Sequence, residues 1–134
     1  MHPFSEGEGK NESSIAVTTN LNGVNVIISG DLDKSGELEI CRRTPELRAD
    51  ILKTGHHGGK TSTAEGYVQQ LQPKLAIISA GRANRYGHPN LETLETLRQN
   101  RISYLNTAKV GMIKLISIGS HNFKIETGNT LKTR

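Results

Sequence analysis

The run LAIISA at residues 75–80 is the feature that most constrains the fold. A short apolar run without a charge is typical of a strand buried on both faces, and such strands belong to parallel sheets covered by helices. Two stretches with apolar residues at helical spacing, 62–72 and 89–100, lie on either side of it. This alternation of helix and strand predicts an α/β protein with helices packed on a sheet.

Shorter patterns extend this sheet. The segments 14–20 and 24–29 predict two strands of a hairpin, because Asn22-Gly23 between them supplies the positive φ that a tight turn demands. The remaining expected elements are a helix at 34–43 and strands at 49–54, 102–105, 110–118 and 122–127. The polar residues Asp33, Lys34 and Glu37 are expected to be solvated surface.

Length and composition favour one small domain. The chain has 134 residues, of which 34% are hydrophobic and only 4% aromatic, so its core should be modest and rich in Ile, Leu and Val. Residues 1–12 are expected to be an irregular lead-in, residues 13–127 the domain, and residues 128–134 a polar tail. The single Cys41 excludes an internal disulfide.

The charge pattern narrows the class of partner. The net charge is +4, but the basic residues are scattered, so an anionic partner is favoured only weakly. The few aromatic residues are far apart, which argues against a stacking platform for bases. The apolar runs are far shorter than a membrane helix needs, so we expect a soluble segment without membrane contact.

Three polar groups each follow a predicted strand directly. They are Asp31, the pair His56-His57, and the segment 81–88 that ends in His88. In layered α/β proteins, the residues just past the carboxyl ends of neighbouring strands converge on one rim. These sequence-distant groups are therefore predicted to meet.

Such a meeting would provide the ligands of a metal ion. A carboxylate with imidazoles suits zinc or manganese, and Asp31 could bridge two such ions. Adjacent histidines on extended backbone point to opposite sides, so only one of His56 and His57 is expected to ligate, and the sequence does not say which. The alternative for Asp31 is an ordinary turn or cap residue.

The residues after the histidines suggest a phosphate clamp. Two glycines allow close approach of the backbone, and Lys60, Thr61 and Ser62 are expected at a helix start, where free amides favour an anion. His88 is a candidate proton donor for a leaving oxygen, or a further ligand. Alternatively, Thr61 or Ser62 only caps the helix, and His88 is a loop residue.

Four segments together resemble a known family: NESSIAV, VNVIISGDLDKSGE, ADILKTGHHGGKTS and LAIISAGRANRYGHP. Their order and spacing are similar, over roughly residues 2–116, to the metallo-β-lactamase-like domain at the carboxyl end of the ComEC/Rec2 DNA-uptake proteins. The resemblance implies that Asp31 bridges the metals and that the HHGG loop holds the last ligand histidine. It further implies that Tyr86 and His88 lie near the site, and that Asn11 with Ser13 or Ser14 matches the N-x-S element of the family.

Two departures from the family pattern matter. The family usually has HHGS where this chain has HHGG, which removes a hydroxyl at Gly59. The H-x-[HD]-x-D-H motif that supplies most of the family's metal ligands is absent from this chain. The chain therefore resembles only the carboxyl-terminal half of a metallo-β-lactamase-like αββα sandwich. We expect its uncovered sheet face to need a partner half or a homo-oligomer.

For the whole domain the resemblance implies metal-dependent hydrolysis of DNA phosphodiesters during uptake, with two zinc or manganese ions. This half alone is expected to be inactive or to bind metal weakly. Two alternatives stay open: a non-catalytic nucleic-acid-binding or assembly module, and a hydrolase of small esters or lactams. Family members can be membrane-anchored with this domain outside the cytoplasmic membrane, but the sequence does not fix the location of this chain.

Overall fold

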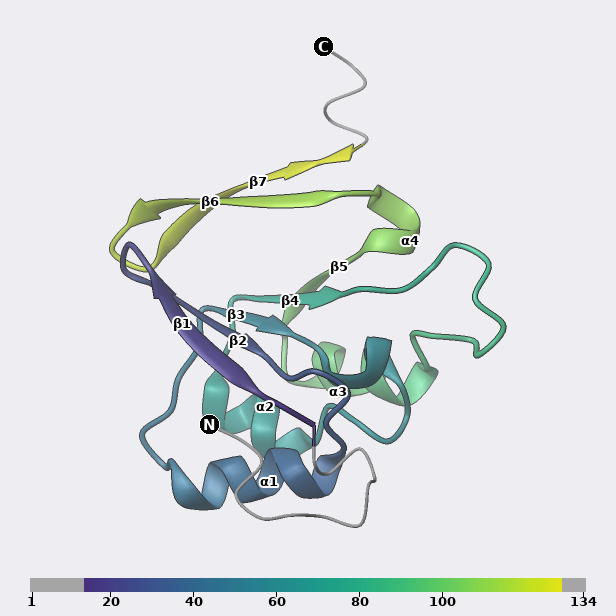
Figure 1. Ribbon diagram of the computed structural model, residues 1–134, viewed down its shortest axis with the longest axis horizontal. Helices are drawn as coiled ribbons and strands as arrows, with labels where there is room; N and C mark the ends of the chain where they lie inside the picture. Colours follow the sequence, from purple (N-terminus) through teal and green to yellow (C-terminus); the bar gives the residue numbers. More distant parts are fainter. Residues whose placement is uncertain (1–13, 129–134) are drawn as a thin grey trace.

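The computed structural model describes residues 14–128, and its centre is a five-stranded sheet in the order β1-β2-β3-β4-β5 (Figure 1). β1 and β2 form an antiparallel hairpin, whereas β2 to β5 run parallel. The predicted α/β class is confirmed. The strands are β1 (Val17–Leu21), β2 (Val24–Ile28), β3 (Ile51–Lys53), β4 (Leu75–Ile78) and β5 (Ser103–Asn106).

Three helices lie together on one side of this sheet (Figure 1). They are α1 (Lys34–Arg43), α2 (Glu65–Leu71) and α3 (Leu91–Gln99), all of them predicted. The α2 helix begins at Glu65, three residues later than its apolar pattern suggested. A short helix α4 (Thr107–Val110) and a 3₁₀ turn η2 (Gly55–Gly58), which were not predicted, complete the set.

The hydrophobic core lies between the sheet and these helices. The predicted apolar face of α2 is buried, with Tyr67, Val68 and Leu71 at most 1% exposed. It packs in one cluster with Ile27 of β2 and Leu52 of β3. Each large side chain buried in this way contributes about 1.5–3 kcal/mol to the hydrophobic free energy of folding.

The face of the sheet away from the helices is less well covered. Strands β6 (Ile113–Gly119) and β7 (Asn122–Thr127) form a separate two-stranded sheet above it (Figure 1). No residue of β6 or β7 is buried. On the main sheet, Val17 is 48% exposed and Ile28 is 44% exposed. Core packing is therefore concentrated on the helical side.

Candidate functional site

The predicted rim forms at the carboxyl ends of β2, β3 and β4. Asp31 follows β2, and His57 follows β3 in the turn η2. Their side chains approach each other, with Nε2 of His57 3.8 Å from Oδ1 of Asp31, and each side chain is about half exposed. This distance is too long for a hydrogen bond, but two metal–ligand bonds of about 2.1 Å each could span it. The parallel register is what brings these distant residues together.

The ring of His57 is fixed by a main-chain carbonyl. Its Nδ1 lies 2.7 Å from the carbonyl oxygen of Ser79, just past β4. A carbonyl oxygen can only accept, so Nδ1 carries a hydrogen, and Nε2 is the ring nitrogen that faces Asp31. Metal-binding histidines commonly show this arrangement, in which one ring nitrogen is anchored and the other is available.

The sequence suggested extended backbone at the two histidines, but the structure places both in the left-handed region. His56 has φ 45° and ψ 45°, and His57 has φ 56° and ψ 23°, so both are left-handed. The chain makes a tight turn here. The different directions of the two rings therefore come from this turn and not from the alternation of side chains along a strand. Left-handed backbone costs a residue with a Cβ roughly 1–2 kcal/mol, and such strain persists mainly where the surrounding structure and function require it.

His56 and His57 point to different parts of the rim. Nδ1 of His56 lies 3.4 Å from Oγ1 of Thr61, which is a long contact. The two ring centroids are 6.5 Å apart. Of the pair, His57 is the one whose ring nitrogen lies 3.8 Å from the Asp31 carboxylate.

His88 joins the same cluster from the loop after β4. Its ring centroid is 5.5 Å from that of His56 and 6.3 Å from that of His57. A Cβ at Gly59 would lie 3.1 Å from Cε1 of His88, so glycine at this position lets His88 pack closely on the histidine turn. A serine in place of Gly59 would crowd the His88 ring and the His56 carbonyl oxygen.

Tyr86 lies at the outer edge of the cluster. Its ring stacks on His88 with centroids 5.9 Å apart, and the residue is 66% exposed. The Arg85 guanidinium lies 5.2 Å from the centroid of the same ring. An exposed tyrosine, an arginine and a histidine thus lie in a row beside the Asp31–His57 pair.

The helix start after the histidines is not the phosphate clamp that the sequence suggested. The amides of Thr63 and Ala64, at the beginning of α2, donate to the two carboxylate oxygens of Glu37 at 2.9 and 2.7 Å. Ser62 is buried, and its hydroxyl donates to the carbonyl oxygens of Gly55 and Gly59. These groups are occupied by the protein itself.

Lys60 and Thr61 remain on the surface of this loop. Both residues are exposed. The amide of Lys60 donates to Oδ1 of Asn90 at 3.0 Å, and Nδ1 of His88 lies 3.2 Å from the same oxygen. Asn90 therefore links the Lys60 backbone to the His88 ring.

Glu37 was predicted as solvated surface, and this prediction is wrong. The residue is 1% exposed, and burial raises its pKa to about 8 despite the two amides that favour the carboxylate. A signal was present in the sequence: Glu37 precedes Ile40 by three positions and Cys41 by four, which places it on the inward face of α1. Asp33 is also structural, because its carboxylate accepts from the amide of Gly36 and caps α1.

Lys53 is a second residue near the rim whose position the sequence did not predict. It comes from the end of β3 and is partly buried, and its Nζ lies 3.4 Å from the carbonyl oxygen of Gly30. Burial lowers its pKa, and the nearby Asp31 carboxylate opposes this effect. The rim thus carries a partly desolvated ammonium group beside its carboxylate.

The predicted site residues do not complete a metal site within the described part of the chain. Among residues 14–128, no group of three histidine, cysteine or carboxylate side chains is arranged to hold an ion. Asp31 and His57 supply two donors, whereas a protein zinc site needs three or four. Asn11 and Ser13 lie outside the described residues.

Fold and rim together define a class: a mixed α/β protein with an exposed carboxylate–histidine pair at the carboxyl ends of its parallel strands. Comparison with known proteins narrows this class, although no family model matches the chain. ComE operon protein 3 of Bacillus subtilis is 48% identical over 105 residues, covering 78% of this chain. Recombination protein 2 of Haemophilus influenzae is 36% identical over 90 residues, covering 67%. Competence protein ComA of Neisseria gonorrhoeae is 31% identical over 93 residues, covering 69%.

The chain is therefore a ComEC/Rec2-like competence-protein segment. It spans 14%, 11% and 14% of the length of these three relatives. Within residues 14–128, no helix is long and apolar enough to cross a membrane.

Proposed function

We propose that this chain is the carboxyl-terminal half of a metallo-β-lactamase-like domain that hydrolyses DNA phosphodiesters during DNA uptake. The observation that carries the proposal is the approach of His57 to Asp31 at 3.8 Å, with the far nitrogen of His57 anchored on Ser79. Two relatives support the biological context, since one is named a competence protein and another a recombination protein.

The uneven packing of the sheet supports the idea of a missing half. Apolar side chains on the face away from the helices stay partly exposed, among them Val17 and Ile28. The same face carries the partly buried ammonium of Lys53. A further layer, supplied by the polypeptide that precedes this segment in the longer relatives, would bury these groups and bring additional ligands to the rim.

In the complete domain, Asp31 and His57 would hold a divalent ion, zinc or manganese, together with ligands from the other half, and the ion would activate the attacking water and polarise the phosphate. Lys60 and Thr61 contact the phosphate, and Tyr86 packs against the nucleotide beside it. His88, stacked between Tyr86 and the histidine turn, delivers a proton to the leaving oxygen. The amides at the start of α2 are not part of this clamp, because Glu37 occupies them.

The proposal is tested by completing the domain. This chain is fused to the segment that precedes the matching region in the Bacillus subtilis relative, and zinc and manganese are measured by elemental analysis beside DNA hydrolysis. The fusion should hold metal in stoichiometric amount and cut DNA, and Asp31→Asn and His57→Gln should lose both properties. Glu46→Gln is the matched control, because this exposed carboxylate lies in the connection before β3, at the opposite end of that strand from the rim. Unchanged metal content in both rim variants would overturn the proposal.

A second function is favoured by one specific observation, the two-donor rim in the described residues. A module that binds nucleic acid or assembles with a partner needs no complete metal site. If the chain is such a nucleic-acid-binding module, the fusion should bind DNA with an affinity that falls steeply with salt, and it should not hydrolyse DNA. Hydrolysis that depends on Asp31 would exclude it.

A further inference from the structure

The sheet face away from the helices is covered at one end and open at the other. Side chains alternate along a strand, so Val24, Ile51 and Leu75 lie on this face, opposite the helix-side residues of the core cluster. They begin β2, β3 and β4, and each is at most 4% exposed. Near the other ends of these strands, Ile28 is 44% exposed and Lys53 is only partly buried. The amino-end half of the face is therefore covered, whereas the half next to the rim is not.

The turn of the β6–β7 hairpin lies against the covered half. His121 in this turn bonds the residue just before each of the three buried strand starts. Its amide donates to the carbonyl oxygen of Gly23 at 3.0 Å. Its Nδ1 lies 2.8 Å from Oδ2 of Asp50, and its carbonyl oxygen accepts from the ammonium group of Lys74. The cover over the amino ends is thus fixed by polar contacts at the hairpin turn.

The hairpin is otherwise loosely joined to the rest of the protein. It forms a sheet of its own, and no residue of β6 or β7 is buried. Gly111, just before β6, has φ 75° and ψ −143°, which glycine adopts more readily than any other residue. The far end of β7 returns to the same place, where the amide of Gly128 donates to the carbonyl oxygen of Met112 at 2.8 Å. Both strands leave the protein at one point, so the hairpin can swing as a unit about Gly111.

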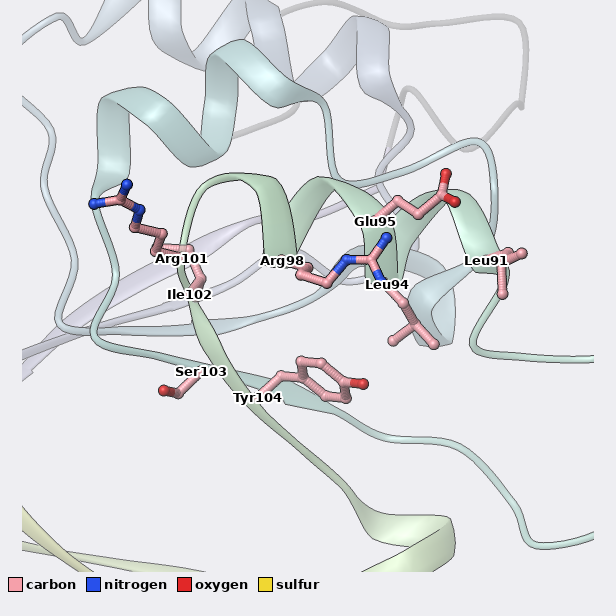
Figure 2. Close-up of a pocket in the computed structure, with 8 residues that line it drawn as sticks. All are labelled: Leu91, Leu94, Glu95, Arg98, Arg101, Ile102, Ser103 and Tyr104. Atoms are coloured by element: carbon pink, nitrogen blue, oxygen red, sulfur yellow. The ribbon is translucent and has the colours of Figure 1, made fainter.

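The elements that carry the base of the hairpin are firmly held. Figure 2 shows α3 leading through Arg101 and Ile102 into β5, which continues past Tyr104. Strand β5 pairs with β4 over four residues, and Ile102 packs against the hydrophobic core cluster. Movement of the hairpin about Gly111 therefore leaves β5 and α3 in place.

We propose that the β6–β7 hairpin is a strap whose turn separates from the amino ends of the strands and pivots at Gly111. When the strap is closed it covers Val24, Ile51 and Leu75. When it opens, these side chains and Ile28 form one continuous apolar surface below the rim. Opening leaves the core between sheet and helices packed, so it requires less free energy than global unfolding. This inference does not rest on the proposed function.

Two adjacent positions of β3 provide the test. Ile51 and Leu52 are each 1% exposed, but Ile51 faces the hairpin side and Leu52 faces the helices. Ile51→Cys and Leu52→Cys are made separately in a Cys41→Ser background, and the reaction of each thiol with DTNB is timed. Each rate is divided by that of the same thiol in the urea-unfolded chain. Position 51 should react about tenfold or more faster than position 52, with little dependence on low urea concentrations, because local opening exposes little surface.

Two further substitutions separate strap opening from global unfolding. Ile40→Val removes a methyl group from the helix-side core, so it should raise the rate at position 52 about fivefold. It should leave position 51 unchanged, because that core stays packed when the strap is open. His121→Ala removes a contact that the open and unfolded states both lack, so it should raise the rates at both positions about fivefold.

Three results would overturn the strap. Equal rates at the two positions, or a rise at both in Ile40→Val, would mean that Ile51 is reached only by global unfolding. An unchanged rate at position 51 in His121→Ala would mean that the turn does not hold the cover closed. Circular dichroism checks the fold of each variant. Hydrogen exchange of the wild type needs no substitution: the His121 amide should exchange faster than the paired amides of β3 and β4, and equal protection contradicts the strap.

Discussion

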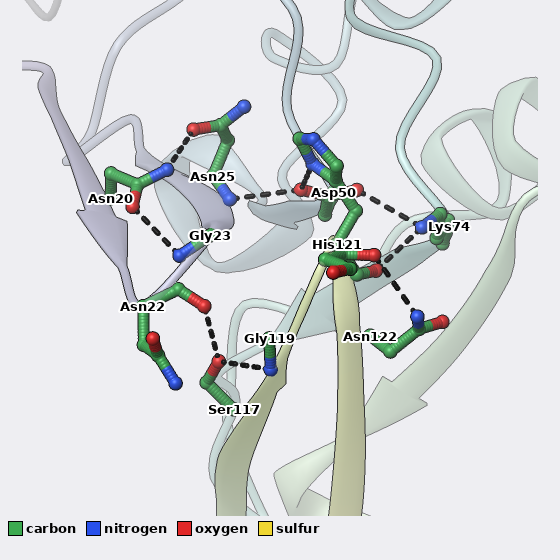
Figure 3. A network of polar contacts seen from close by, with 11 residues as sticks. Asn20, Asn22, Gly23, Asn25, Asp50, Lys74, Ser117, Gly119, His121 and Asn122 are labelled. Atoms are coloured by element: carbon green, nitrogen blue, oxygen red, sulfur yellow. Dashed lines mark hydrogen bonds and ion pairs between the residues drawn. The ribbon is translucent and has the colours of Figure 1, made fainter.

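The two ends of the central sheet use the same residue types to different effect. At the amino ends of the strands, Asp50 accepts from Asn25, His121 and Lys74, at distances of 2.8 to 3.2 Å (Figure 3). At the carboxyl ends, Asp31 has His57 at 3.8 Å, and both side chains are about half exposed. The Asp50 carboxylate is buried and its oxygens are occupied by three donors, so we call it saturated. The Asp31 carboxylate is half exposed and could still bind a ligand, so we call it available.

The saturated cluster is an attachment point for the β6–β7 hairpin. His121 lies in the turn between these strands and reaches the Asp50 carboxylate, while Lys74 donates to the His121 carbonyl oxygen at 2.5 Å (Figure 3). Ser117 donates to the carbonyl oxygen of Asn22 in the β1–β2 turn. An aspartate and a histidine in contact therefore indicate a functional site only when their hydrogen-bonding capacity is left unused.

The largest expected effect comes from removing the saturated carboxylate. Asp50→Ala should lower the free energy of unfolding by about 3 kcal/mol, because a buried acceptor shared by three donors is lost. Urea denaturation measures the change, with Asp31→Ala as the matched control. If Asp31→Ala were the more costly of the two, the distinction between the two ends would be wrong.

The next largest effect on stability should come from Glu37, whose carboxyl group binds the amides of Thr63 and Ala64 at the end of the histidine loop. Its pKa is raised to about 8 in the folded state from an ordinary value of 4.5. The folded protein therefore keeps a proton that the unfolded chain has released, so stability is greatest below pH 4.5 and falls as the pH rises towards 8. We expect a loss of about 2 kcal/mol between pH 6 and pH 8.

Glu37→Gln checks this sign. The glutamine can no longer ionise, so the variant should show a flatter dependence of unfolding free energy on pH across the same window. Thermal denaturation at a series of pH values gives the comparison. A wild type whose unfolding free energy is as flat as that of the variant between pH 6 and pH 8 would mean that Glu37 is already ionised in the folded protein and that the two amides outweigh its burial.

Weakening the attachment of the β6–β7 hairpin should lower the free energy of unfolding less than either change above. His121→Ala removes one of the three donors to Asp50 and should cost about 1 kcal/mol. It should also speed hydrogen exchange of the β6 and β7 amides relative to those of β3 and β4. Exchange that accelerates equally throughout the chain would show that the cluster supports the whole fold rather than the hairpin.

The ionisation of Asp50 gives a second test of the difference between the two ends of the sheet. Burial opposes its ionisation, but the Asn25 amide, His121 and Lys74 outweigh this effect and hold the pKa below its ordinary value. Its contribution to stability is therefore present above the ordinary aspartate pKa and lost as the pH falls through the folded-state value. Acid unfolding of the wild type should consequently be steeper than that of Asp50→Asn, which chemical denaturation below pH 4 would measure.

The smallest effect is expected at the available rim. Asp31→Ala should change the free energy of unfolding by less than about 0.5 kcal/mol, because this exposed carboxylate has no close hydrogen bond to any side chain or amide of residues 14–128. Denaturant unfolding of the chain alone provides the measurement. A loss above about 2 kcal/mol would make Asp31 a structural residue and remove the basis of the proposed site.

Much of the fold was predictable, because periodicity is a local property. The strand at LAIISA, the buried face of α2 and the Asn22-Gly23 hairpin were all predicted from spacing and turn chemistry. The convergence of Asp31 and His57 was predictable from parallel strand order. The left-handed backbone of both histidines was not, since only glycine, asparagine and aspartate commonly signal that conformation in a sequence.

The missed residues share one cause. Glu37 acts on the amides of Thr63 and Ala64, 26 and 27 positions away. His121 meets Asp50 across 71 positions. The helical spacing of Glu37 indicates its inward direction, but no local pattern reports whether a polar side chain finds such a distant partner.

By itself the sequence determined which segments are strands and helices, and which polar residues follow the strands to a common rim. It also carried the similarity that places the chain among ComEC/Rec2-like competence proteins. Only the tertiary structure decided which of the polar residues are saturated, as Glu37 and Asp50 are, and which stay available, as Asp31 does. The physical reason is that hydrogen-bond satisfaction and burial depend on residues far apart in the chain, whereas the periodicity that forms an element depends on its neighbours.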